Sequence, residues 1–101
     1  MFKQDFFNKV LNIVASLTEL SADQILNGKK TDEVVDARWI IVRLLSEHGC
    51  HTSRIAMLLH MTQRNVTYIL TVFQDRLDQY DSFFKATYQK ARIEVGNLKE
   101  I

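Results

Sequence analysis

The chain has 101 residues, of which 47% are hydrophobic and 25% are charged. This composition is typical of one globular domain and not of a disordered segment. The chain contains no proline, three glycines and one cysteine, Cys50, so a β-sandwich or barrel is disfavoured and an intramolecular disulfide is excluded. Thirteen basic and twelve acidic residues give a net charge of only +1, which weakly disfavours binding to a polyanion but leaves room for a local basic patch. We therefore expect a single all-α domain of five to six helices.

Neither a membrane segment nor a secretion signal is expected. No apolar run approaches the roughly 20 residues that span a bilayer. The first ten residues include an acid and lack the apolar centre of a signal peptide. Together with the lone cysteine, which suits a reducing compartment, these features predict a bacterial-type cytoplasmic protein that has no contact with a membrane.

Apolar residues at steps of three and four positions predict the first and third helices, and cap residues predict a short helix between them. The first helix has an apolar stripe formed by Phe2, Phe6, Val10, Ile13, Val14 and Leu17. Ser21 and Gln24 match a capping box at the start of a short helix, and Gly28 is expected to end that helix in the left-handed conformation. The third helix is anchored in the core by Trp39 and closed by Gly49, and its apolar face consists of Val34, Val35, Ala37, Ile40, Ile41, Leu44 and Leu45.

Two helices joined by a tight turn are predicted at about residues 52–71. The first runs for about two turns up to His60, with Thr52 or Ser53 as N-cap, and the second starts at Met61–Thr62. A helix-turn-helix needs apolar residues on the facing sides and a small residue at the crossing, and the chain supplies Ile55, Ala56, Leu59, Met61, Val66 and Ile69. His60 stands where a glycine is usual, and histidine is among the residues that reach a positive φ.

A last helix is predicted within residues 78–101, fading near Gly96, with Phe83, Phe84, Tyr88 and Val95 on it. We interpret the two aromatic doublets, Phe6–Phe7 and Phe83–Phe84, as parts of a core that both terminal helices close. The alternative is a homodimer formed through these aromatic helices.

The outer face of the second helix of the pair is polar and free of acids. It carries Thr62, Gln63, Arg64, Asn65, Thr67, Tyr68 and Thr71. Arginine can read guanine, glutamine and asparagine can read adenine, and threonine can contact a thymine methyl group or a phosphate. Because recognition helices contact bases from their N-terminal part, this face predicts base contacts to double-stranded DNA by Gln63, Arg64 and Thr67.

Over about residues 20–77 the chain resembles the C-terminal DNA-binding domain of the bacterial replication initiator DnaA, and more loosely the Trp-repressor-like folds. The resemblance lies in Ile25-Leu26-Asn27, the basic loop Lys29-Lys30-Thr31, Val34-Val35-Asp36-Ala37-Arg38, the long helix to Leu45, and the helix pair at 52–71. It implies that the basic loop enters the minor groove and that the second helix of the pair enters the major groove. Residues 1–19 and 78–101 lie outside the match.

The chain also departs from this family. The family's Asp-His-Thr-Thr signature is replaced by Gln63-Arg64-Asn65-Val66, and Asp32, Glu33 and Asp36 stand where the family is rich in arginine. No glycine-rich phosphate loop is present, so the ATPase module and the role in origin recognition are not carried over.

These features predict a non-enzymatic DNA-binding domain without cofactor or metal. The predicted contacts come from Lys29, Lys30, Thr52, Ser53, Arg54, Thr62, Gln63, Arg64, Asn65, Thr67 and Tyr68, with Lys29, Lys30 and Arg54 docking on phosphates. One alternative is a helical protein–protein interaction module that kept the fold and lost DNA binding, which the low net charge favours. Zinc or thiol chemistry at His48, Cys50, His51 and His60 is disfavoured, because their spacing does not match a zinc finger or a catalytic pair.

Overall fold

The structure is a computed structural model that describes residues 4–79 and 82–98. Every regular element in these two ranges is an α-helix: α1 (Gln4–Thr18), α2 (Ala22–Asn27), α3 (Asp32–Glu47), α4 (Thr52–Leu58), α5 (Gln63–Gln79) and α6 (Ser82–Gly96). The predicted all-α fold of five to six helices is therefore confirmed. Within the same ranges, no helix combines the length and the apolar character needed to cross a membrane.

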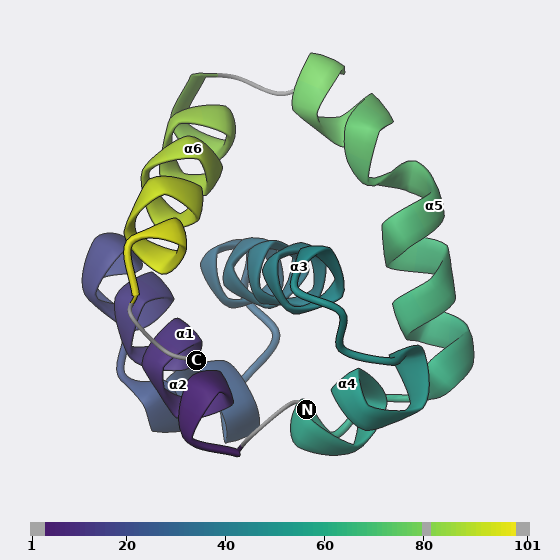
Figure 1. The fold of residues 1–101 in the computed structure, drawn as a ribbon. Coiled ribbons are helices and arrows are strands. Elements are labelled where there is room, and N and C mark those ends of the chain that lie inside the picture. Colours follow the sequence, from purple (N-terminus) through teal and green to yellow (C-terminus); the bar gives the residue numbers. More distant parts are fainter. Residues whose placement is uncertain (1–3, 80–81, 99–101) are drawn as a thin grey trace.

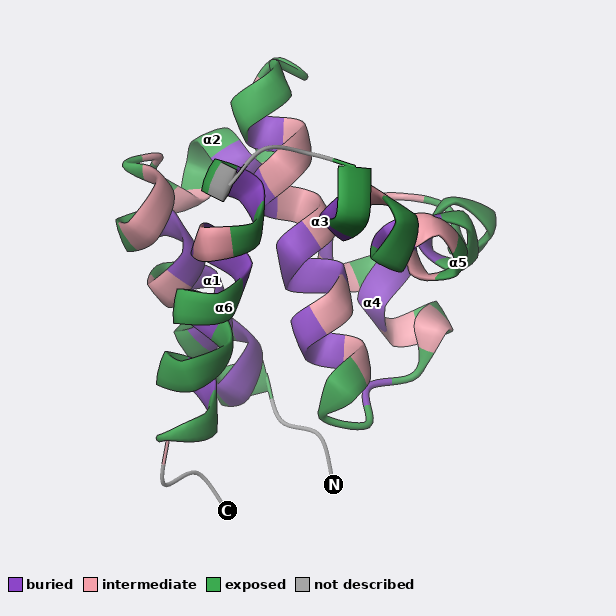
Figure 2. Cartoon of the chain, turned by 90° about the horizontal axis from the view of Figure 1, so that it is seen from above, coloured by how far each residue is buried: buried purple, intermediate pink, exposed green. Residues whose placement is uncertain are grey.

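Helix α3 is the centre of the fold. Figure 1 shows it end-on, with α1, α2 and α6 on one side and α4 and α5 on the other. Its predicted apolar face is almost entirely buried, as the purple segments in Figure 2 indicate, and only Val35 in this face is half-buried. A central helix flanked on two sides buries more than one stripe, which is why Val42 is also fully buried.

Helix α1 packs on α3 and α6 through the predicted stripe, although the stripe is wider than expected. Phe6, Val10 and Val14 are buried, and Phe7 and Leu11 join them, whereas Ile13 and Leu17 are half-buried. Phe2 lies outside the described residues.

The ends of α2 and α3 test three predictions about helix caps. The capping box is confirmed: the backbone N–H of Gln24 donates to Ser21 Oγ (3.0 Å), and the N–H of Ser21 donates to Gln24 Oε1 (2.8 Å). The prediction for Gly28 is wrong, because its φ of −79° and ψ of 178° are extended, not left-handed. A Cβ at Gly28 would lie 2.6 Å from Gln24 O, so glycine is needed there for space. Gly49 does close α3 in the left-handed region, with a φ of 87°.

The aromatic residues are divided between the core and the surface. Phe73 is fully buried, and its ring meets those of Phe84 and Tyr88 at centroid distances of 5.7 and 5.0 Å. Trp39 is only half-buried and lies at the edge of the core, so the prediction of a core anchor is partly wrong. Both rings of Phe6–Phe7 are buried within the chain, whereas Phe83 is 64% exposed and Phe84 is buried.

A polar cluster at the C-terminal end of α3 ties α6 to the centre of the fold. The Tyr88 hydroxyl donates to Glu47 Oε2, and Arg43 Nε lies 3.1 Å from the same oxygen. Burial, together with the hydrogen bond to the Glu47 carboxylate, raises the pKa of Tyr88 to about 12. The buried tyrosine is therefore held in its neutral, donating form.

Candidate nucleic-acid interface

Helices α4 and α5 pack face to face across a four-residue turn. The predicted inward residues Ile55, Ala56, Leu59, Val66 and Ile69 are all buried, and Met61 in the turn is half-buried. His60 adopts a φ of 57°, as predicted for the position where a glycine is usual. The N–H of Met61 donates to Ala56 O at 3.0 Å, which closes the end of α4 and directs the chain into α5.

The N-caps of the two helices differ in part from expectation. Helix α4 is capped by His51, whose Nδ1 accepts from the N–H of Ser53 (3.2 Å), so the prediction of Thr52 or Ser53 as N-cap is wrong. Histidine is an uncommon N-cap, whereas threonine and serine are common ones. Residue preference alone therefore placed the N-cap of α4 after its actual position at His51. Helix α5 begins after Thr62, whose Oγ1 accepts from the N–H of Asn65 (3.0 Å).

The predicted outer face of α5 points into solvent. All seven of its residues are exposed: Thr62, Gln63, Arg64, Asn65, Thr67, Tyr68 and Thr71. Gln63 Nε2 donates to Thr52 Oγ1 at 2.8 Å, so the first turn of α5 is held against the first turn of α4. Tyr68 meets Trp39 edge-on at a centroid distance of 6.2 Å, and this contact orients the tyrosine over the junction of α3 and α5.

The segment that forms α4, the turn and most of α5 has an unusual charge pattern. Between Glu47 and Asp75 there is no acidic residue, whereas Arg54, Arg64 and all three histidines of the chain lie there. The segment thus has a charge of +2 before any histidine is protonated, and the rest of the chain has a net charge of −1. The near-neutral total hides a local excess of positive charge on α4 and on the part of α5 before Asp75.

The predicted docking residues lie in two places. Ser53 is exposed and Thr52 and Arg54 are half-buried on α4, next to the outer face of α5. Lys29 and Lys30 are exposed in the loop between α2 and α3, at the end of α3 opposite the one that leads to α4 (Figure 1). With 16 residues, α3 is about 24 Å long, so the loop forms a separate contact point.

Two arginines that the sequence analysis did not single out hold the helices around this surface. Arg38 donates to two carbonyls in the last turn of α2, from Nε to Ile25 O (2.6 Å) and from Nη2 to Leu26 O (3.3 Å). Arg76 on α5 forms an ion pair with Asp36 on α3 and stacks on the Trp39 ring, with its Cζ 4.4 Å from the ring centroid. Both partners are distant in sequence, so no local pattern could have identified them.

The histidines and the cysteine do not converge on one point. Cys50 is buried, and burial raises the pKa of its thiol while nearby Arg54 lowers it in part. The His48 ring lies against that of Phe6 (5.2 Å between centroids), His51 caps α4, and His60 forms the turn. In the described ranges no three histidine, cysteine or acidic side chains are arranged to hold a metal ion.

No family model, curated protein or solved structure matches this chain. The resemblance to the DNA-binding domain of DnaA therefore stays a prediction from the residues that carry it. The function is argued below from the chain's own geometry and charge.

Proposed function

We propose that this chain is a non-catalytic domain that binds double-stranded DNA, with the N-terminal half of α5 in the major groove. The observation that carries the proposal is the acid-free surface of α4 and of the part of α5 before Asp75, on which exposed hydrogen-bonding side chains and positive charge coincide. Phosphate attraction supplies most non-specific affinity, and an acid on this face would oppose it. A helix presented by a packed partner helix has the geometry that reads base edges.

In the proposed complex, residues in the first two turns of α5 make the base contacts. Arg64 makes no hydrogen bond or ion pair with any residue in the described ranges, so its five donors are available for a guanine. The amide nitrogen of Gln63 donates to Thr52, which leaves its carbonyl oxygen as the acceptor for a base donor. Thr67 lies one turn further along the same face.

Phosphate contacts fall to the start of α4 and to the loop before α3. In helix-turn-helix proteins the first helix of the pair crosses the DNA backbone. Here that helix is α4, and its first turn consists of Thr52, Ser53 and Arg54. Lys29 and Lys30 would reach the adjacent minor groove or its phosphates, as the resemblance to DnaA implies. The proposal includes no role in origin recognition.

One observation favours the rival function, a protein–protein interaction module that does not bind DNA. Asp32 and Glu33 are exposed directly after the loop that carries Lys29 and Lys30, and they repel phosphates at that contact point. If these acids dominate, the loop contributes nothing and duplex affinity is lost or confined to α5.

Salt dependence of duplex binding separates the two functions. Four basic residues, Lys29, Lys30, Arg54 and Arg64, would release counterions, so the log–log slope of affinity against salt should be about −3 to −5. Fluorescence anisotropy with a labelled duplex at several salt concentrations measures this slope. If the chain shows no binding to duplex DNA even at low salt, the protein–protein interaction module is the correct function.

Single substitutions then separate base reading from docking. Arg64→Ala should weaken binding to the preferred site by about 1–3 kcal/mol and flatten the preference at one base pair. Lys30→Ala should weaken all duplexes about equally and reduce the slope by about one. Lys90→Ala, which removes the same charge from an exposed position on α6, is the matched control and should change neither. A selection from randomised duplexes that yields the same preferred sequence for Arg64→Ala as for the wild type would exclude α5 as the reader.

A further inference from the structure

A side-chain hydrogen bond joins the first residue of α4 to the first residue of α5. Gln63 Nε2 donates to Thr52 Oγ1 at 2.8 Å, between residues that are 11 positions apart in the chain. The two helices are capped by other residues: His51 is the N-cap of α4, and Thr62 Oγ1 accepts from the N–H of Asn65 at the start of α5. The bond between Thr52 and Gln63 therefore orients a side chain on the face of α5 that is proposed to enter the major groove.

The chemistry of these two groups decides what Gln63 can offer to a base. A hydroxyl can accept and donate at the same time, and a glutamine amide has two N–H donors and one acceptor oxygen. When one N–H of Gln63 donates to Thr52, the side chain still presents Oε1 and its second N–H. Adenine has the matching pair of groups in the major groove, a donor at N6 beside an acceptor at N7. The oriented amide therefore matches adenine.

A phosphate of the DNA backbone would set the direction of this hydrogen bond. The first helix of the pair crosses the backbone in helix-turn-helix complexes, and Thr52 lies half-buried in the first turn of that helix, α4. Phosphate oxygens only accept, so a Thr52 hydroxyl that donates to a phosphate can only accept from Gln63. The amide nitrogen is then held at Thr52, and Oε1 faces the N6 donor of adenine. An amide turned the other way would set its N–H donors against that donor.

We propose that Thr52 is a positioning residue that makes Gln63 selective for adenine, by linking the base contact of α5 to a phosphate contact of α4. The inference rests on the proposed function, because it requires α5 to lie in the major groove. Thr52 reads no base itself and acts through the orientation of the Gln63 amide. Valine has nearly the same shape as threonine but neither accepts nor donates, so in Thr52→Val the amide can turn and the selectivity is lost.

The test measures base preference at the position that Gln63 reads. A selection from randomised duplexes gives the preferred site of the wild type, and the same selection with Gln63→Ala identifies the base pair whose preference is lost. Fluorescence anisotropy then compares duplexes that differ only at this pair. We expect the wild type to prefer adenine about tenfold or more over each other base, and Thr52→Val to prefer it about threefold or less. Thr52→Ser keeps the hydroxyl and should retain the wild-type preference.

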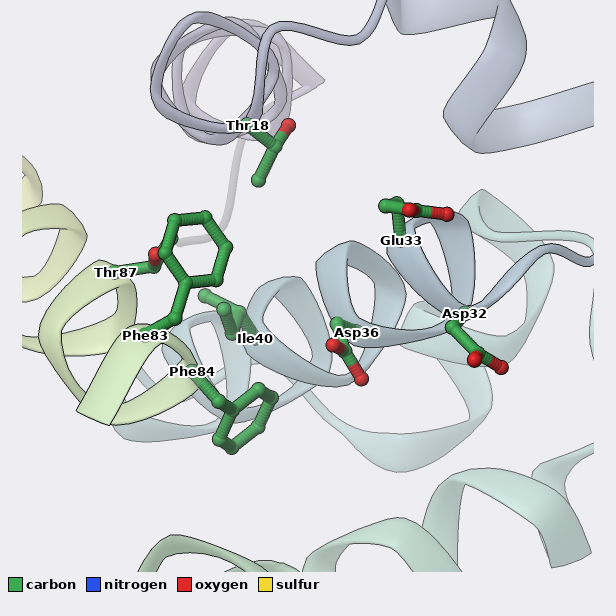
Figure 3. A pocket seen from close by; sticks show the side chains of 8 residues that line it. All are labelled: Thr18, Asp32, Glu33, Asp36, Ile40, Phe83, Phe84 and Thr87. Atoms are coloured by element: carbon green, nitrogen blue, oxygen red, sulfur yellow. The ribbon is translucent and has the colours of Figure 1, made fainter. Parts of the chain in front are cut away.

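A matched control and a double variant make the test specific. Thr87 is only 6% exposed and lies on α6, in the pocket between α1, α3 and α6 that Figure 3 shows. Thr87→Val therefore makes the same change at a site that a duplex bound to α5 does not touch, and it should leave the adenine preference unchanged. In Thr52→Val combined with Gln63→Ala, the preference at this pair should equal that of Gln63→Ala alone, because Thr52 acts through Gln63.

The possible results separate this inference from the proposed function. An adenine preference that survives Thr52→Val would leave Thr52 as a phosphate contact only and overturn the inference. It would also be overturned if Thr52→Ser lost the preference, if the wild type selected guanine or thymine at this pair, or if Gln63→Ala changed no preference. The bond is exposed to water in the free protein, so its loss should leave the melting temperature nearly unchanged. A wild type that binds no duplex would overturn the proposed function as well.

Discussion

The tyrosine buried against Glu47 predicts a measurable loss of stability in alkali. Burial and the Glu47 carboxylate raise the pKa of Tyr88 from its ordinary 10 to about 12, while the unfolded chain keeps the ordinary value. A raised pKa stabilises the fold fully below pH 10, and this contribution is lost as the pH rises through 12. Each pKa unit corresponds to 1.36 kcal/mol. At pH 11, midway between the two values, the loss should therefore be about 1.4 kcal/mol.

Urea unfolding of the wild type and of Tyr88→Phe at pH 7, 9 and 11 isolates this loss. At pH 7 the variant should be less stable by about 1–2 kcal/mol, because it lacks the hydrogen bond to a charged acceptor. Between pH 9 and 11 the wild type should lose about 1.4 kcal/mol more than the variant. Tyr68→Phe, at a tyrosine that is 57% exposed, is the control and should follow the wild-type pH dependence. If the unfolding free energies of Tyr88→Phe and of the wild type decrease by the same amount between pH 9 and 11, the Tyr88 hydroxyl does not donate to Glu47.

Three further substitutions, two of them with a comparison variant, test the packing that positions the proposed interface. Ala56→Leu should overpack the contact of α4 with α5 and cost about 1–3 kcal/mol; an unchanged melting temperature would show that Ala56 does not lie at the crossing. Gly28→Ala should destabilise by about 1–2 kcal/mol, because the new Cβ would meet Gln24 O at 2.6 Å. Gly96→Ala, which meets nothing within 4 Å, should be neutral or stabilising in the same thermal melts. Arg38→Met should lower the free energy of unfolding by about 1–3 kcal/mol, because it leaves two carbonyls of α2 unpaired. Arg38→Lys should recover only part of that stability. Equal stability of the two variants in urea unfolding would contradict the bidentate contact.

Local patterns were sufficient to predict most of the fold. The spacing of apolar residues located every helix except α2, because a helix that packs on one side must repeat its apolar residues with the helical period. Ser21 and Gln24 identified a helix start, since both partners of a capping box lie within one turn. The prediction for Gly28 failed because glycine is needed there for space: a Cβ would come too close to Gln24 O. Only the three-dimensional arrangement reveals this close approach of backbone atoms.

The candidate interface was predictable for a similar reason, but only in part. The inward residues of α4 and α5 follow from their period, and the exposed positions on α5 follow by elimination. The cap of α4 by His51 was missed because a cap depends on backbone geometry as well as on residue preference.

The sequence by itself determined the helical class, the positions of the helices and the absence of acids between Glu47 and Asp75, because each of these depends on neighbouring residues or on composition. The tertiary structure alone decided what meets across the fold. It pairs Arg76 with Asp36 over 40 residues of chain, brings the Tyr88 hydroxyl to Glu47, and sets the ring of Tyr68 against that of Trp39. Such contacts join residues on different helices, and the angle and rotation at which helices pack depend on the shape of the whole core.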